Sequence, residues 1–236
     1  MPTVLLWLLW LMAPGQDAAM VNPRIARVEF ENDAIRIVRV HYGAREKLAM
    51  HAHPAKVAVC VTGGLARITT EEGKTTEARS AAGDFSWAEP TRHAVENLSD
   101  DPLEFVEIEL KRATSPGAAA EMEPQPSYAE EPKEPIPVEL EPHHHPKFRN
   151  QYVRVLEVVI PPGESTYFHK HIHDSVAVIL SDGTSQNQVF GEEWSAPGPM
   201  KAGRAGFTED SKKPRVHRLK NAGNTTLHII DLEILQ

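Results

Sequence analysis

Cysteine is almost absent from the sequence. The single residue, Cys60, excludes a disulfide within the chain. Its neighbours Val59 and Val61 are typical of a buried strand, where cysteine behaves as a small hydrophobic side chain. The protein therefore has to be stable without disulfides.

Positive charge and helical periodicity are also scarce. The formal net charge is -8, which argues against a broad attraction to phosphate backbones, and no nucleic-acid partner is expected. No long stretch has the helical period, so a helical bundle is excluded. Hydrophobic residues make up 41% and charged residues 25% of the chain. This composition is typical of a globular protein and not of a disordered or membrane-embedded one.

One uninterrupted apolar run occupies residues 4–13. It has the length of a signal-peptide core and is too short to span a bilayer alone. Small residues follow at 16–19, where cleavage is expected, but no Lys or Arg precedes the run. A mispredicted start or a buried N-terminal strand is the other interpretation. We expect a signal segment over residues 1–19, a periplasmic or secreted protein, and no membrane association after signal removal.

An internal repeat organises the rest of the chain. Residues 30–40 align without a gap onto residues 148–158, an offset of 118. The repeat also pairs histidines: His51 and His53 with His169 and His171 at the same offset, and His93 with His217 at an offset of 124. The two halves are copies of one unit.

The copies are separated by a different kind of sequence. Residues 113–146 are rich in Pro and Glu and predict a semi-stiff surface linker, although the alternation of Ile136, Val138 and Leu140 leaves an edge strand open. The linker divides the chain into a first unit at 22–112 and a second at 147–236. In both units, short β-branched or alternating runs between Gly-containing turns predict strands, so each unit is an all-β sandwich or barrel.

The paired histidines predict metal sites. Two histidines at i and i+2 on a strand project to one side, and a third on a later strand can join them by antiparallel pairing. Three neutral imidazoles suit a divalent transition metal such as Fe, Mn, Ni, Cu or Zn. A single pair of this kind is common by chance, and its histidines are then ordinary polar residues. Its recurrence in both copies favours the interpretation that these histidines are metal ligands. The candidates are His51, His53 and His93 in the first unit, and His169, His171 and His217 in the second.

These motifs resemble those of the cupin superfamily. The segment from Gly163 to His171 is similar to the first cupin motif, and the segment from Gly206 to Asn221 is similar to the second. The first copy matches through Gly83, Pro90, His93 and Asn97, and less completely through His51, His53 and Gly64. The resemblance implies two tandem cupin jelly-roll β-barrels, a bicupin, with a metal held inside each barrel.

Two departures distinguish the copies from the family pattern and from each other. Cupins commonly add a glutamate ligand shortly after the second histidine, where this chain has Val57 or Ala58, and Ser175 or Val176. Arg45 also replaces the opening glycine in the first copy, so the second site is better formed. Without the carboxylate the site remains dicationic, which favours anionic substrates or oxygen species, and ligand positions stay open for them.

Further histidines lie near the second site. His173 and Asp174 are interpreted as a residue that supports the ligands by hydrogen bonding and as a turn cap, respectively, although either could add a ligand. The run His143, His144 and His145 lies at the end of the linker and is expected to be solvated at the surface, although it could bind a metal adventitiously. Several aromatic residues are either barrel lining or core: Tyr167, Phe168, Phe190 and Trp194 in the second copy, and Phe85 and Trp87 in the first.

Three functions remain open from the sequence. The first is an exported metal-dependent enzyme, an oxygenase-type protein that acts on a small molecule. The second is a non-catalytic cupin that binds a small molecule or a metal. The third is an isomerase-like cupin, which needs a general base beside the metal. The two barrels are expected to pair with each other or with a second chain, so a homodimer is a candidate assembly.

Overall fold

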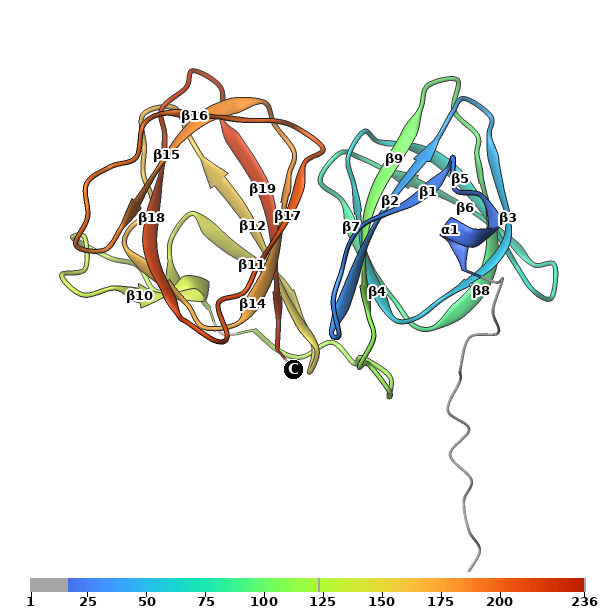
Figure 1. Cartoon of the computed structure of the whole chain (residues 1–236), viewed down its shortest axis with the longest axis horizontal. Helices are drawn as coiled ribbons and strands as arrows, with labels where there is room; N and C mark the ends of the chain where they lie inside the picture. Colours follow the sequence, from blue (N-terminus) through green and yellow to red (C-terminus); the bar gives the residue numbers. More distant parts are fainter. Residues whose placement is uncertain (1–16, 123, 236) are drawn as a thin grey trace, which may run out of the picture.

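The computed structural model describes residues 17–122 and 124–235, and these form two barrels side by side (Figure 1). Apart from two very short helical segments, every regular element in the described residues is a strand. The prediction of an all-β, two-barrel fold is confirmed. Neither helical segment in this part of the chain has the length or apolar character needed to cross a membrane.

The first barrel consists of two facing antiparallel sheets. One has the strand order β1-β2-β9-β4-β7 and the other β3-β8-β5-β6. The elements are α1 (Ala18–Val21), β1 (Ala26–Glu31), β2 (Ile35–Tyr42), β3 (Lys47–His53), β4 (Lys56–Cys60), β5 (Gly64–Thr70), β6 (Thr75–Ser80), β7 (Phe85–Ala88), β8 (Thr91–Asn97) and β9 (Leu103–Leu110).

The second barrel repeats this layout and adds one strand, β10, at the edge of its second sheet. Its sheets have the orders β11-β12-β19-β14-β17 and β10-β13-β18-β15-β16. The elements are β10 (Ile136–Pro137), the 3-10 helix η1 (Val138–Leu140), β11 (His144–Arg149), β12 (Val153–Ile160), β13 (His169–His171), β14 (Asp174–Ile179), β15 (Gly183–Val189), β16 (Gly198–Met200), β17 (Ala205–Thr208), β18 (Arg215–Asn221) and β19 (Leu227–Ile234). The internal repeat is therefore a repeat of topology.

Part of the predicted linker belongs to the second barrel. The strand β10 pairs with β13, so an edge strand is present at Ile136, whereas Val138 and Leu140 of the same alternation lie in the 3-10 helix η1. The strand β11 begins at His144 and pairs along β12. Proline and histidine at these positions hide the alternation that would have revealed the strand. Residues 136–146 thus contribute structure to the barrel that follows them.

The two barrels pack against each other through their five-stranded sheets β1-β2-β9-β4-β7 and β11-β12-β19-β14-β17. One hydrophobic cluster contains side chains of both, including Val57 and Val59 from the first and Val176 and Val178 from the second. The two halves therefore share an apolar core and are not joined through the linker alone.

Aromatic side chains at equivalent positions of the two copies make equivalent contacts at this interface. Phe30 stacks on Phe207 with ring centroids 4.7 Å apart, and its counterpart Phe148 stacks on Trp87 at 6.3 Å. Phe85 also meets Phe148. Of the two interpretations of Phe85 and Trp87, lining or core, the structure supports core, because both residues pack against the hydrophobic cluster between the barrels. The halves are arranged like the two subunits of a dimer.

The predicted signal segment lies almost entirely outside the described residues. Its last residues, however, are part of the first barrel. Asp17 caps α1 by accepting a hydrogen bond from the backbone N–H of Ala19 at 2.8 Å, and it forms an ion pair with Arg36. A cleavage after Ala19 would remove both contacts, so export, which stays a prediction, is compatible with this fold if cleavage precedes Asp17.

Candidate metal centre in the second barrel

The predicted trio of the second barrel meets in the structure. The antiparallel pairing of β13 with β18 places His169 opposite His217. The ring centroids of His169 and His171 are 5.0 Å apart, and that of His217 lies 4.6 Å from the first and 5.1 Å from the second. All three side chains are buried. As predicted, the strand pairing brings the third histidine beside the first two.

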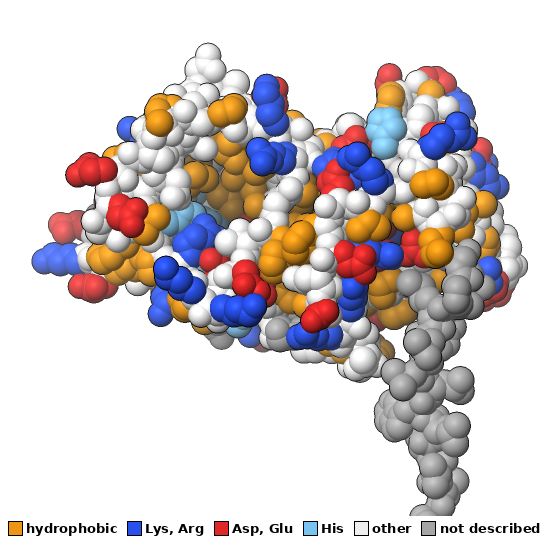
Figure 2. Space-filling view, viewed as in Figure 1, with side chains coloured by type: hydrophobic (Ala, Val, Ile, Leu, Met, Phe, Trp, Pro, Cys, Tyr) orange, Lys and Arg blue, Asp and Glu red, His pale blue; other side chains and the backbone are white. Residues whose placement is uncertain are grey.

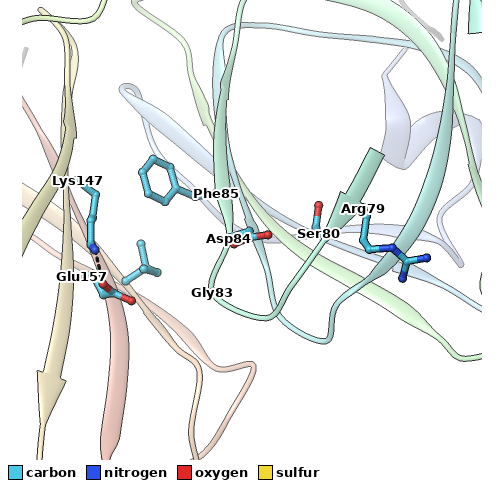
Figure 3. Close-up of a pocket in the computed structure, with 8 residues that line it drawn as sticks. Arg79, Ser80, Gly83, Asp84, Phe85, Lys147 and Glu157 are labelled. Atoms are coloured by element: carbon cyan, nitrogen blue, oxygen red, sulfur yellow. Dashed lines mark ion pairs between the residues drawn. The ribbon is translucent and has the colours of Figure 1, made fainter. Parts of the chain in front are cut away.

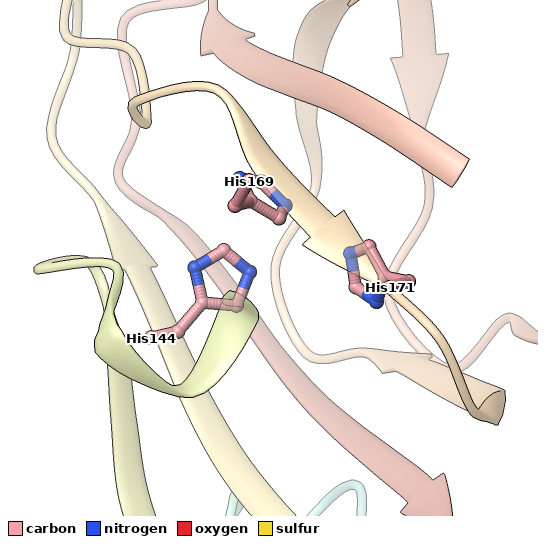
Figure 4. Close-up of side chains that lie close together, drawn as sticks. All are labelled: His144, His169 and His171. Carbon is pink, nitrogen blue, oxygen red and sulfur yellow. The ribbon is translucent and has the colours of Figure 1, made fainter. Parts of the chain in front are cut away.

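A fourth histidine, His144, completes the cluster. It is 5% exposed, and its ring centroid lies 4.5 Å from that of His169. One potential ligand atom from each of His144, His169 and His171 lies within 4.8 Å of the others (Figure 4). The expectation that the run 143–145 is solvated was wrong for His144. On a strand every second side chain faces inward, and in β11 that position falls on His144.

Glu141 orients His144. Its carboxylate, fully buried, accepts a hydrogen bond from Nδ1 of His144 at 2.6 Å, and backbone N–H bonds from His143 at 2.9 Å and Tyr167 at 3.0 Å. Although burial alone would raise the pKa of Glu141, hydrogen bonds from His143 and His144 hold it well below its usual range. Glu141 is therefore ionised and leaves Nε2 of His144 free as a ligand.

The imidazole rings of His169 and His217 are also oriented by a hydrogen bond at Nδ1. Nδ1 of His169 donates to the backbone carbonyl of Tyr167 at 2.9 Å, and Nδ1 of His217 donates to Oδ1 of Asn187 at 2.5 Å. Each ring therefore keeps its Nε2 lone pair for another partner. Sequence reasoning missed Asn187 and Glu141, because an amide on a polar strand and one acid in a Glu-rich segment carry no distinguishing signal.

The cluster has the protonation state that a metal requires. Burial lowers the pKa of His169 to about 3, and it lowers the pKa values of His171 and His217 still further. These imidazoles are neutral at pH 7, as nitrogen ligands must be. Moreover, Nε2 of His169 and Nδ1 of His171 are buried without a hydrogen-bond partner. Unpartnered ring nitrogens among convergent neutral imidazoles fit a transition metal.

An arginine stands at the edge of the cluster. Nη1 of Arg215 donates to Nε2 of His217 at 2.7 Å, while Nε and Nη2 hold the carboxylate of Asp210 at 3.1 and 3.0 Å. The Arg215 side chain is 30% exposed, whereas that of Asp210 is almost fully buried. Arg215 therefore lies between the buried histidines and solvent. In Figure 2 histidine side chains are visible in a hollow of the second barrel.

A buried carboxyl group lies on the other side of the cluster. Oδ2 of Asp231 is 4.0 Å from Nδ1 of His171. Burial and the neighbouring carboxylate of Glu233 raise the pKa of Asp231 to about 6. A carboxyl group with a pKa of about 6 beside the histidine cluster can accept or release a proton near neutral pH.

The first barrel has the same three histidines but different neighbours. His51 lies opposite His93, and the ring centroid of His93 is 4.8 Å from that of His51 and 4.9 Å from that of His53. The position of His144 is taken by Ala26, since Ala26 pairs with Val40 as His144 pairs with Val158. Among the described residues, a group whose ligand atoms lie within 4.8 Å is found in the second barrel alone.

The first barrel also contains a buried ammonium group. Lys56 lies opposite Glu109 as Ser175 lies opposite Glu233, so Lys56 and Ser175 are equivalent. Nζ of Lys56 is 2.7 Å from Oε1 of Glu107, and its side chain is 5% exposed. The alignment that placed Val57 at a ligand position was shifted by one residue. Val57 faces the other barrel, because side chains alternate along the strand.

The remaining candidates lie away from the cluster. Asp174 accepts a backbone N–H bond from Ser211, which fits its interpretation as a turn cap. His173 lies in a bend between β13 and β14, so the same-face argument for it fails. Phe168, Phe190 and Trp194 are not barrel lining: the guanidinium of Arg218 stacks over Phe168 and Trp194, and Phe190 is 49% exposed.

A separate cleft lies between the barrels (Figure 3). Its volume is about 400 Å³, and its lining includes Arg79, Asp84 and the ion pair of Lys147 with Glu157 at 2.8 Å. No histidine of either cluster lines it. The cleft is therefore distinct from the candidate metal centre.

Comparisons with known proteins bear on the fold. No family model and no curated protein matches the chain. The structure of AerE from Microcystis aeruginosa is similar with a TM-score of 0.59, at 13% identity over 90% of this chain and 98% of that one. The cupin 2 conserved barrel domain protein from Leptotrichia buccalis has a TM-score of 0.52, at 14% identity over 89% and 88%. An oxalate decarboxylase variant from Bacillus subtilis has a TM-score of 0.54, at 14% identity over 85% and 68%.

Proposed function

Since the chain has the fold of two tandem cupin barrels, a bicupin, we propose that its second barrel is a metal-dependent enzyme of the oxygenase type that acts on a small anionic molecule. One observation carries this proposal: four buried histidines converge from β11, β13 and β18, ligand atoms of three of them lie within 4.8 Å of one another, and unpartnered ring nitrogens remain among them. Bound there, a redox-active divalent metal would supply Lewis acidity and electron transfer.

The chain's own residues have defined roles in this proposal. His144, His169, His171 and His217 would hold the metal. Glu141 keeps Nδ1 of His144 occupied, so that Nε2 stays directed to the cluster. The oxalate decarboxylase of Bacillus subtilis, which has a similar fold, has Mn(II) centres. This supports manganese among the candidate metals Fe, Mn, Ni, Cu and Zn.

The test is the metal content of the purified protein by elemental analysis. We expect close to one redox-active metal per chain, lost in the double variant His169→Ala/His171→Ala and retained in the matched first-barrel variant His51→Ala/His53→Ala. Oxygen consumption with panels of small anionic molecules would then follow. No metal above background after reconstitution would leave a non-catalytic binding protein instead.

Asp231 favours a second candidate function, an acid–base reaction of the isomerase type. Its carboxyl group lies 4.0 Å from His171 and titrates near neutral pH, with a pKa of about 6. Such a group can move a proton on a metal-bound substrate. If Asp231→Asn abolishes turnover while oxygen uptake is never observed, the acid–base function replaces the oxygenase function.

We also propose that the protein is exported, on the basis of the apolar run at residues 4–13. Fractionation of cells expressing the full chain tests this. Recovery of a shortened protein in the periplasm or medium, with its N-terminus at or before Asp17, is the expected result. A full-length cytoplasmic protein would contradict it.

A further inference from the structure

We infer that Arg215 binds the carboxylate group of the substrate, which makes the second barrel specific for small carboxylic acids. This inference rests on the proposed function and names its substrate class. It starts from the orientation of a single guanidinium group. In the strand pairing, Arg215 lies opposite His171, so its side chain projects to the same side of the sheet as the histidine ligands.

Asp210 holds the guanidinium in one orientation. It engages Nε and Nη2 through both of its oxygens at 3.1 and 3.0 Å, and it is 2% exposed. A bidentate pair of this kind fixes the plane of the group. The remaining nitrogen, Nη1, is directed at the cluster, where it lies 2.7 Å from Nε2 of His217.

Metal binding would free this donor. Nδ1 of His217 is occupied by Asn187, so Nε2 is the nitrogen left for a metal, and it is also the present acceptor of Nη1. When Nε2 coordinates a metal, Nη1 loses its acceptor. A carboxylate oxygen of the substrate would then accept a hydrogen bond from Nη1 in place of His217.

The charge balance favours an anion at the same place. Arg215 is balanced by Asp210. A divalent metal would add positive charge beside the free donor, and the ionised carboxylates of Glu141 and Asp231 offset part of that charge. The Arg215 side chain is 30% exposed, so it lies between the buried cluster and solvent.

Comparison of the two barrels shows that this feature is not imposed by the fold. The first-barrel residue that pairs with His53, as Arg215 pairs with His171, is Thr91. Thr91 has a short neutral side chain that carries no positive charge. A carboxylate-binding arginine next to the histidine cluster is therefore a property of the second barrel alone among these two equivalent sites.

The test is binding to the Co(II)-loaded protein, followed by its visible absorption and by calorimetry. We expect acetate to bind and the neutral isostere acetamide not to bind. Arg215→Gln should weaken acetate binding about 10- to 100-fold, the usual value of a charge-assisted hydrogen bond. Arg215→Lys should restore part of the affinity. The matched control is Arg218→Gln, on the outer face of the same strand, which should bind acetate like the unmodified protein.

The metal content of each variant separates the two levels of failure. If the unmodified protein binds no metal, the proposed function fails and this inference with it. If metal is retained but acetate binds equally to the Arg215→Gln variant, or phosphate binds more tightly than every carboxylate tested, the inference alone is overturned. Should Arg215→Gln not fold, Asp210→Asn is the second variant, and unchanged acetate affinity there overturns the proposal too.

Discussion

The two barrels share one fold and one arrangement of three histidines, but they differ at the positions around those histidines. Three equivalent pairs differ: Ala26 and His144, Lys56 and Ser175, Thr91 and Arg215. The second barrel gains a ligand and an anion-binding group, whereas the first holds a buried ammonium. The comparison teaches that one histidine pattern can be surrounded by different residues, which change the charge beside it and the number of imidazoles that converge.

The barrels nevertheless keep a common polar support. Arg36 donates to Glu109 at 2.6 Å in the first barrel, and Arg154 donates to Glu233 at 2.5 Å in the second. Each arginine also pairs with an acid from the segment that precedes its barrel, Asp17 or Glu139. Differences in metal binding therefore arise against a shared interior framework.

The largest expected effect is the creation of a metal site in the first barrel. The variant Ala26→His/Lys56→Ser copies the second barrel's residues, adding an imidazole and removing a buried positive charge. We expect the metal content to rise from about one to about two per chain, measured by elemental analysis. Ala26→His alone is the control and should not gain the second metal. Two metals per chain in the unmodified protein would contradict this comparison.

The buried ion pair of the first barrel should be costly to break. Lys56→Met leaves the carboxylate of Glu107 buried without its partner, so the free energy of unfolding should fall by about 3–5 kcal/mol. The variant Lys56→Met/Glu107→Leu removes both charges and should recover most of that loss. Denaturant unfolding of the metal-free protein measures both. Equal stability of the single and double variants would show that the pair is not coupled.

Acid should destabilise both metal-free barrels, and metal should protect only the second. Burial lowers the pKa of His53 to about 4 and those of His93 and His169 to about 3. Between pH 6.5 and 4 the unfolded chain binds protons that the folded chain does not, so stability falls as pH falls. The raised pKa values of Asp231 and Glu109 oppose this, but more histidines are shifted than carboxyls.

Hydrogen exchange of each barrel across this pH range gives the readout. We expect added metal to slow exchange in β13 and β18 and to leave β3 and β8 unchanged. Equal protection of both barrels by metal would remove the distinction between them.

Loss of the carboxylate that orients His144 should weaken metal binding to a smaller extent. Glu141→Gln removes the charge from the acceptor of His144 Nδ1, so metal affinity should fall about 10- to 100-fold. Glu164→Gln is a matched control, since the Glu164 side chain is exposed and its carboxylate pairs with His143 at the surface. Competition with a chromophoric chelator measures both affinities, and an equal loss in the two variants would argue against orientation by Glu141.

The smallest effect concerns a backbone difference between the barrels. Arg45 has a φ of 59°, the left-handed region, where the second barrel has Gly163 at 83°. Arg45→Gly relieves that conformation and should stabilise the chain by up to about 1 kcal/mol, because a side chain costs about 1–2 kcal/mol there and glycine loses more entropy on folding. Thermal unfolding measures the change, and the reverse variant Gly163→Arg should destabilise.

Much of the architecture followed from local pattern. Alternating apolar residues predicted the strands, and the repeat of Phe30 and Phe148 together with the histidines predicted two copies. The pairing of His169 with His217 was also anticipated, because antiparallel neighbours bring distant residues together. His144, by contrast, was assigned to the surface, since a run of three histidines in a proline-rich segment has no visible period.

The sequence by itself determined the all-β class, the duplication and three of the four histidines of the second cluster. Only the tertiary structure decided that His144 and Glu141 come from the connecting segment, that Lys56 is buried and Arg215 contacts His217, and that the barrels bury Val57 and Val176 against each other. The reason is geometric. Which side of a strand faces the interior depends on its register with partners far away in the chain, and a shift of one residue exchanges the two sides.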